Sequence, residues 1–239
     1  MAAMGAAPRW VTLALALPAA NEAWLDQFAR GFFALAERFG VELIGGDTTR
    51  GPLAICITIL GEVPKGLALF RSGARAGDDI WVSGQLGDSA LALVQPGIPA
   101  AARRLDEPEP RVELGERLRG LASAAIDVSD GFAQDLGHIL ERSGAGAIVE
   151  YELLPRSVEV KKIQDGKLQA RLVLCGGDDY ELVFTAPQAS RGEIEALSSE
   201  LALALSRVGS VQAGEPRLQV LDAQGRPMAV ERGFDHFAP

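Results

Sequence analysis

The residue types best suited to chemistry occur together in residues 124–131, which read AAIDVSDG. A short β-type run surrounds Asp127, and after Gly131 apolar residues recur at helical spacing, at Phe132, Leu136, Ile139 and Leu140. Asp127, Ser129 and Asp130 therefore stand where a predicted strand passes directly into a predicted helix. Carboxylates beside free backbone N–H groups at such a junction suit a hard cation that holds phosphate oxygens. The alternative is that Ser129 or Asp130 caps the helix and Asp127 is a solvated strand end.

Two further segments combine paired glycines with acidic residues. Residues 45–50 (GGDTTR) follow a predicted strand at 41–44, and residues 176–182 (GGDDYEL) follow another predicted strand at 172–175. Bare backbone, carboxylates and hydroxyl groups in one turn are what a metal–phosphate site needs, although a polar loop between strands has a similar composition. The sequence therefore contains three acidic turns that fit the same chemistry.

The elements that must position these turns include both regular types. Residues 10–17, 41–44 and 52–63 predict strands, the last with strict alternation of faces. Asn21 caps a predicted helix with an apolar stripe, formed by Trp24, Phe28, Phe32, Leu35 and Phe39. Strands and helices continue to alternate along the rest of the chain, so the pattern favours a protein that mixes α and β structure.

The overall composition excludes several classes of protein. The 239 residues carry a net charge of −9, which argues against a nucleic-acid-binding surface. No apolar run reaches the roughly 18 residues that would span a membrane. Cys56 and Cys175 are isolated, so neither a disulfide framework nor a zinc site is indicated. The simplest interpretation is a cytoplasmic protein that binds neither nucleic acid nor membrane.

The acidic turns, taken with other motifs in order, resemble the thiamine-monophosphate kinase family, within the superfamily of ATP-binding proteins similar to aminoimidazole ribonucleotide synthetase. The motifs that carry the resemblance are GGDTTR (45–50), FRSGA (70–74) with GDSA (87–90), AIDVSDG (125–131) and GGDDYEL (176–182). The opening residues 2–10 and the closing GFDHF (233–237) extend the resemblance over essentially the whole chain.

The resemblance implies a fold, a reaction and an assembly. The fold is two-lobed, synthetase-like α/β (α+β), with residues 1–63 as a truncated N-terminal ATP-binding and dimerisation lobe built on a mixed sheet. Residues 64–239 form a complete C-terminal α/β lobe. The reaction is phosphorylation of thiamine monophosphate to thiamine diphosphate by ATP, with Mg²⁺, through direct in-line transfer and no covalent enzyme intermediate. Family members act as homodimers.

Matched residue by residue, the resemblance also implies a set of site residues. The implied Mg²⁺ ligands are Asp47, Asp127 and Asp130. The implied ATP contacts are Gly46, Asp47, Arg71 and Ser129. The implied contacts with thiamine monophosphate are Asp178, where the family often has glutamate, and Phe234, an aromatic suited to stacking on a thiamine ring.

One departure from the family pattern affects the expected activity. Family members have a further N-terminal segment, which supplies additional acidic Mg²⁺ ligands and a substrate-contacting histidine. Either the sequence is N-terminally truncated or the protein lacks part of its site, and if the chain is complete we expect weak or absent turnover. In both cases we expect an unpaired strand edge or exposed apolar surface in the first lobe. A catalytically impaired, nucleotide-binding remnant is the main alternative. Another enzyme of the superfamily, such as a selenophosphate or aminoimidazole ribonucleotide synthetase, is disfavoured by the GGDDYEL and GFDHF pair.

Overall fold

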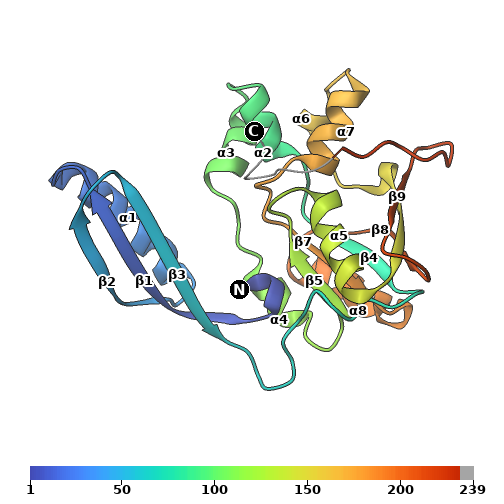
Figure 1. Ribbon diagram of the computed structural model, residues 1–239, viewed down its shortest axis with the longest axis horizontal. Helices are drawn as coiled ribbons and strands as arrows, with labels where there is room; N and C mark the ends of the chain where they lie inside the picture. The colour runs from blue at the N-terminus through green and yellow to red at the C-terminus, as the bar shows by residue number, and fades with distance from the viewer. Residues whose placement is uncertain (232–239) are drawn as a thin grey trace. The chain divides into compact units, whose positions relative to one another are not determined.

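The computed structural model describes residues 1–231, which divide into two compact units (Figure 1). Unit 1 comprises residue 1 and residues 6–66, and unit 2 comprises residues 2–5 and the chain from residue 67 onwards. The sequence places the lobe boundary after residue 63, and the structure places it after residue 66. Within the described range, no helix combines the length and apolar character needed to cross a bilayer.

Unit 1 consists of one helix and a mixed sheet of order β2-β1-β3. Its elements are β1 (Ala7–Leu17), α1 (Glu22–Arg38), β2 (Glu42–Arg50) and β3 (Ala54–Glu62). Helix α1 begins where predicted, because the Asn21 side chain accepts a hydrogen bond from the Trp24 N–H at 3.1 Å. Strand β1 pairs in parallel with β2 and antiparallel with β3. The predicted mixed sheet of the first lobe is confirmed.

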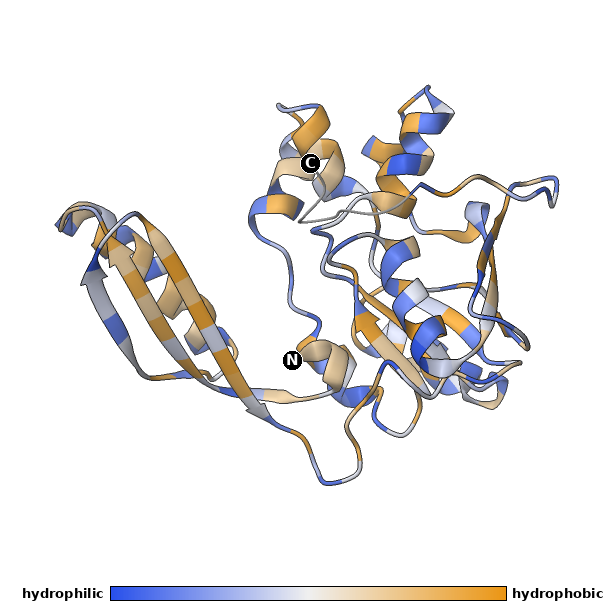
Figure 2. Ribbon diagram, viewed as in Figure 1, coloured by the Kyte–Doolittle hydropathy of each residue, from blue (hydrophilic) through white to orange (hydrophobic). Residues whose placement is uncertain are grey.

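The two faces of the unit 1 sheet differ. Val11 and Leu15 of β1 are buried on one face, which α1 covers, whereas Ala14 is exposed on the other. Strand β3 has apolar side chains that stay open to solvent, with Ile57 exposed by 50% and Leu60 by 43%. Figure 2 shows this hydrophobic strand along the edge of the sheet. The expected exposed apolar surface in the first lobe is therefore present in unit 1.

Unit 2 is organised around a second sheet, of order β5-β7-β4-β8-β6-β9. All neighbouring strands in it are antiparallel except β6 and β9. Its strands are β4 (Asp79–Ser83), β5 (Ala124–Asp127), β6 (Gly146–Glu150), β7 (Leu182–Ala186), β8 (Leu205–Gln212) and β9 (Leu218–Leu221). The mixed α/β class predicted from the sequence is confirmed by the two sheets and their helices.

Helices pack on both faces of the unit 2 sheet (Figure 1). They are η1 (Ala2–Met4), α2 (Asp88–Val94), α3 (Pro99–Asp106), α4 (Val112–Arg117), α5 (Phe132–Ser143), η2 (Tyr151–Leu153), α6 (Val158–Lys161), α7 (Gly166–Cys175), η3 (Gln188–Ser190) and α8 (Arg191–Glu200). One core contains Ile80 and Ile126 with the apolar sides of α5 and α7. The other contains Trp81 and Phe184 with residues of α4 and α8. Because the sheet is covered on both faces, every residue of β4 and β7 is buried, including the polar residues Asp79, Ser83 and Thr185.

Two predicted elements are wrong. Residues 45–50 (GGDTTR) are not a loop after a strand but the second half of β2, paired with β1. Gly46 is required there because a Cβ atom would lie 1.9 Å from the Leu13 carbonyl oxygen. Residues 172–175 are not a strand but the last turn of α7, because a four-residue apolar run does not distinguish a buried strand from a buried helix end.

Candidate active site

The structure brings two of the acidic turns side by side at one end of the unit 2 sheet. Strands β5 and β7 are antiparallel neighbours, with Asp127 opposite Leu182, so the loop after β5 meets the loop before β7. The Asp178 N–H donates to the Ser129 carbonyl at 3.0 Å, and the Tyr180 N–H donates to the Val128 carbonyl at 2.9 Å. Asp127, Ser129 and Asp130 therefore share one small region with Asp178 and Tyr180. After the roles that the family resemblance implies for them, we call residues 127–131 the metal loop and residues 176–181 the acceptor loop.

Glycines allow these loops to approach each other. A Cβ atom on Gly177 would lie 2.3 Å from the Ser129 carbonyl oxygen, and one on Gly131 would lie 2.9 Å from the Cys175 carbonyl carbon. Gly131 also has φ of +121°, which disfavours other residues. The sequence suggests that such glycines expose bare backbone to a phosphate. In the structure these two serve instead to pack one loop against the other.

The metal loop is held by a residue that the sequence analysis did not identify. Asp135, in the first turn of α5, accepts hydrogen bonds from the N–H groups of Ser129, Asp130 and Gly131 at 3.0, 3.0 and 3.2 Å. These N–H groups are therefore not free to bind phosphate, contrary to the first interpretation. The capping role proposed in the alternative is also wrong, because the residue at the N-cap of α5 is Gly131, although Asp127 does lie at the partly exposed end of β5. Burial raises the pKa of the Asp135 carboxyl.

In the part of the chain that the structure describes, the carboxylates exposed beside the two loops form no ion pairs. Asp127, Asp130 and Asp178 are all partly exposed, and none takes part in an ion pair with a described residue. Within residues 1–231, the contacts of the Asp130 carboxylate are long, with the Ser129 hydroxyl at 3.4 Å and the Gln134 amide at 3.5 Å. Three unneutralised carboxylates in one region attract a cation.

Tyr180 lies against this acidic group. Its hydroxyl donates to Oδ1 of Asp178 at 3.2 Å. Burial raises the pKa of the Tyr180 phenol, and the nearby charges of Asp178, Asp127 and Asp130 raise it further. The phenol therefore stays protonated at neutral pH and acts as a hydrogen-bond donor.

The donor set fits Mg²⁺ only in part. Mg²⁺ prefers oxygen ligands and commonly takes one or two carboxylates, with water and substrate phosphates completing the shell. Asp127 and Asp130 supply two such carboxylates. Among the described residues, however, no group of three or more His, Cys, Asp or Glu side chains is arranged to hold a metal ion. Asp127 and Asp130 would therefore supply at most two of the ligands of a Mg²⁺ ion, and water and phosphate oxygens would have to supply the others.

Two acidic side chains of the acceptor loop, for which the sequence predicts no role, are buried beneath it. Residues 178 and 180 project outward, whereas Asp179 and Glu181 are 1% and 0% exposed. Oδ2 of Asp179 accepts the Gly87 N–H at 2.7 Å, and Oδ1 accepts the Ser89 N–H at 3.4 Å. The loop is therefore tied to the start of α2, 92 residues earlier in the chain.

Because the Asp179 carboxyl is buried, the free energy of unfolding should depend on pH through its titration. Desolvation raises the pKa of Asp179 from 3.8 to about 7, although its two backbone hydrogen bonds act in the opposite direction. A carboxyl whose pKa is raised on folding stabilises the fold at low pH and loses that contribution as pH rises towards the folded pKa. The free energy of unfolding of the wild type should therefore fall relative to Asp179→Asn as pH rises from 5 to about 7. Urea titrations at several pH values measure this difference, and a constant difference would contradict the prediction.

The remaining predicted site residues lie elsewhere or outside the described part. The Arg71 carbonyl accepts from the hydroxyl of Ser143 at 3.2 Å, so its backbone sits at the opposite end of α5 from Asp130. Gly46 and Asp47 belong to β2 of unit 1, where Asp47 pairs with Ala14 on the face away from α1.

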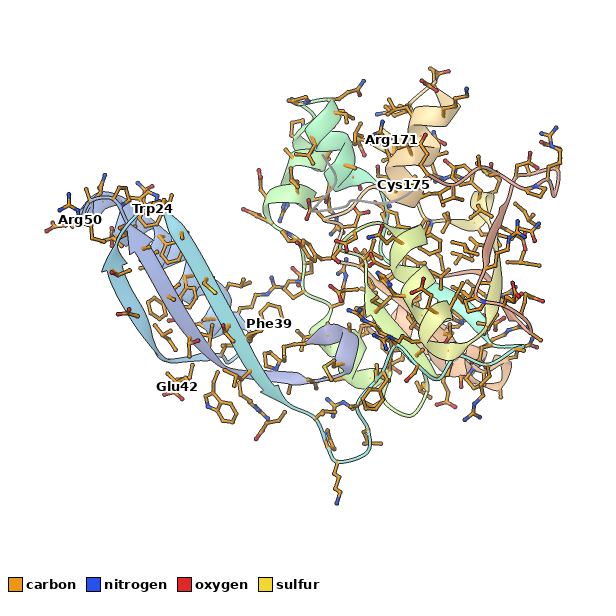
Figure 3. All side chains as sticks on the ribbon, viewed as in Figure 1. Trp24, Phe39, Glu42, Arg50, Arg171 and Cys175 are labelled. Atoms are coloured by element: carbon orange, nitrogen blue, oxygen red, sulfur yellow. The ribbon has the colours of Figure 1, made fainter. Side chains whose placement is uncertain are left out.

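Phe234 falls outside the described residues. The last described residue, Glu231, is held at α7. Its carbonyl accepts from the Cys175 thiol at 3.4 Å, and its carboxylate lies 3.7 Å from Arg171 (Figure 3 shows both α7 residues). Glu231 therefore lies beside the helix that leads into the acceptor loop.

Comparison with known proteins gives the family. Residues 1–63 match the family described as "AIR synthase related protein, N-terminal domain". The chain is 43% identical over 249 aligned residues to the thiamine-monophosphate kinase of Salmonella typhimurium, and the match covers 100% of this chain and 76% of that protein. The chain belongs to the thiamine-monophosphate kinase family. Family membership makes it a thiamine-phosphate kinase by homology and confirms the resemblance stated from the motifs.

Solved structures of the thiamine-monophosphate kinase family have the same fold. The enzyme from Stenotrophomonas maltophilia K279a matches 95% of this chain and 75% of its own, with a TM-score of 0.89 and 45% identity. AaThiL complexed with AMPPCP and TMP matches 99% of this chain and 76% of its own, with a TM-score of 0.83 and 29% identity. That relative therefore binds an ATP analogue and TMP on a fold shared over nearly all of this chain.

Proposed function

We propose that the chain catalyses transfer of the γ-phosphoryl group of ATP to thiamine monophosphate. An oxygen of the acceptor phosphate attacks the γ-phosphorus in line, the bond from that phosphorus to the bridging oxygen breaks, and ADP leaves. The observation that carries the proposal is the pairing of the metal loop with the acceptor loop, which gathers unneutralised carboxylates at one place. The AaThiL complex with AMPPCP and TMP supports the choice of substrates.

The acceptor does not need a general base to attack. A phosphate monoester has its second pKa near 6, so its attacking oxygen is mostly deprotonated at pH 7. The side chains exposed beside the two loops are carboxylates, a hydroxyl and a phenol, and they need only position and neutralise the reactants. Catalysis by positioning and electrostatics is typical of phosphoryl transfer.

We assign Asp127 and Asp130 as Mg²⁺ ligands, and Asp47 as a third on the family resemblance. A bound Mg²⁺ would neutralise the charge that develops on the transferring phosphoryl group. Gly46, Arg71 and Ser129 are proposed contacts of ATP, again by resemblance. Asp178 and Phe234 are the proposed contacts of thiamine monophosphate. The homodimer implied by the family would use unit 1, whose exposed β3 isoleucines are the kind of apolar surface that an interface buries.

The test is conversion of thiamine monophosphate to thiamine diphosphate by the purified 239-residue chain. We expect slow formation of thiamine diphosphate that requires both ATP and Mg²⁺, with ADP formed in equal amount, detected by chromatography. Reactions without Mg²⁺, and reactions with thiamine in place of thiamine monophosphate, are the controls. Binding of both ligands without any turnover would contradict the proposal and favour the impaired remnant.

A further inference from the structure

A buried ion triad lies directly under the acceptor loop. Both carboxylate oxygens of Glu181 accept from the Arg111 guanidinium, at 2.6 and 2.7 Å, and Oε1 also accepts from Arg104 at 2.6 Å. The Ser83 hydroxyl donates to Oε2 at 2.6 Å, which satisfies the carboxylate fully. The Arg111 and Arg104 side chains are 14% and 23% exposed, so the triad is largely removed from water.

The surrounding chain leaves room for this carboxylate and for little else. A Cβ atom on Gly84 would lie 2.0 Å from Oε1 of Glu181. Gly84 also has φ of +59°, a conformation that favours glycine. Arg104 belongs to α3 and Arg111 is the N-cap of α4, so the triad joins the segment between these helices to the acceptor loop. Ion-pair geometry and backbone shape therefore specify where residue 181 lies.

The conformation of the outward residues depends on these inner ones. Asp178 and Tyr180 have φ of +63° and +49°, left-handed values that cost free energy for residues other than glycine. Such conformations persist where neighbouring structure holds them, and they concentrate at functional sites. Here the neighbours that hold them are Asp179, bound to the start of α2, and Glu181 in its triad. The buried carboxylates of Asp179 and Glu181 therefore hold the loop so that the Asp178 carboxylate and the Tyr180 phenol face solvent.

The metal loop has a separate support. Asp135 binds three consecutive N–H groups of that loop and comes from α5, an element that contributes nothing to the triad. The side-chain partners of Glu181 come from β4, α3 and the start of α4, and only its backbone carbonyl bonds to the metal loop, accepting from the Val128 N–H at 2.8 Å. The two loops of the site therefore rest on two different parts of unit 2.

We propose that Glu181, clamped by Arg104 and Arg111, is a positioning residue for the acceptor side of the site, while Asp135 positions the metal and nucleotide side. The inference rests on the proposed function, because it takes Asp178 as a contact of thiamine monophosphate. Neither residue touches a reactant. Each acts through the loop that it holds.

A matched pair of variants tests this division. Glu181→Gln and Asp135→Asn each remove one buried negative charge and retain the size of the side chain. Isothermal titration of the whole 239-residue chain gives the Kd of thiamine monophosphate and the Kd of AMPPCP with Mg²⁺. We expect Glu181→Gln to weaken thiamine monophosphate binding by about tenfold or more and to leave AMPPCP binding within about threefold, since lost positioning contacts typically cost 10–100-fold. Asp135→Asn should show the opposite pattern.

We call these opposite selectivities of the two variants the crossed pattern. A general loss of stability would not produce it, because it would weaken the binding of both ligands in both variants. If both variants weaken both ligands alike, or if Glu181→Gln leaves thiamine monophosphate binding unchanged, the proposal is wrong. Should Glu181→Gln fail to fold, Arg111→Lys replaces it, because lysine keeps the charge but cannot make the bidentate contact. The same selective loss is expected for that variant.

Turnover measured in parallel separates this inference from the proposed function. If the variants show the crossed binding pattern but the wild type forms no thiamine diphosphate, the proposed function is wrong and the positioning roles are supported. A wild-type chain that turns over while the pattern is absent would overturn only the positioning roles. Failure of the wild type to bind either ligand would overturn both.

Discussion

Replacing Asp130 by asparagine should lower the Mg²⁺-dependent rate of thiamine diphosphate formation by at least about 100-fold, the effect typical of removing one group that stabilises transition-state charge. The Asp130 carboxylate makes only long contacts and has no ion-pair partner among the described residues. Its charge is therefore available to a metal ion. Asparagine keeps the shape and one acceptor oxygen but removes the charge, so the loss should appear in the Mg²⁺ dependence as well as in kcat.

A matched control keeps this prediction specific. Asp106 ends α3 on an exposed surface and has the same charge. Asp106→Asn changes the net charge equally and should leave turnover within about twofold, because it makes no contact with either loop and exposed charges are strongly screened. If Asp130→Asn retains most of the wild-type rate, the assignment of this residue to the metal is wrong.

Replacing Glu181 by alanine should reduce the free energy of unfolding by about 3 kcal/mol, because removing one partner of a buried ion pair leaves uncompensated charge. Two guanidinium groups, those of Arg104 and Arg111, would lose their shared carboxylate. Both are partly reached by solvent, which places the loss at the lower end of the range for buried pairs. Urea unfolding followed by circular dichroism measures the change.

The control for this prediction is an ion pair on the surface. Glu200 bonds to Arg117, and both side chains are about half exposed. Glu200→Ala should cost less than about 1 kcal/mol, since exposed pairs are screened by water and salt. A loss below 1 kcal/mol in Glu181→Ala as well would mean that the buried triad does not stabilise the fold.

Much of the fold and of the site was predictable from local sequence. The Asn21 cap lies three residues from the N–H that it binds, and the alternation of residues 52–63 needs only the neighbouring side chains. The family resemblance is also carried by short motifs, and the comparisons confirm it over the whole chain. Motifs of this kind identify Asp127, Ser129 and Asp130 as candidates, because the chemistry of a metal–phosphate site is concentrated in adjacent residues.

The sequence was misleading where a local pattern has two physical solutions. GGDTTR has the composition of a loop, yet its backbone pairs with β1 through the second half of β2. The apolar run at 172–175 suits a strand but ends α7. In both cases the deciding interactions are hydrogen bonds and packing with partners distant in sequence or along the helix, which composition does not record.

What only the tertiary structure decided is how the reactive side chains are held. Asp135 is an ordinary helix residue in the sequence, and its role depends on three N–H groups turning towards it. Glu181 finds Arg111 at a separation of 70 residues and Arg104 at 77, while Asp179 finds the start of α2 at 92. Local sequence specifies which groups are reactive because their chemistry is intrinsic to the residue type. Their support comes from long-range contacts that exist only once the unit 2 sheet has formed.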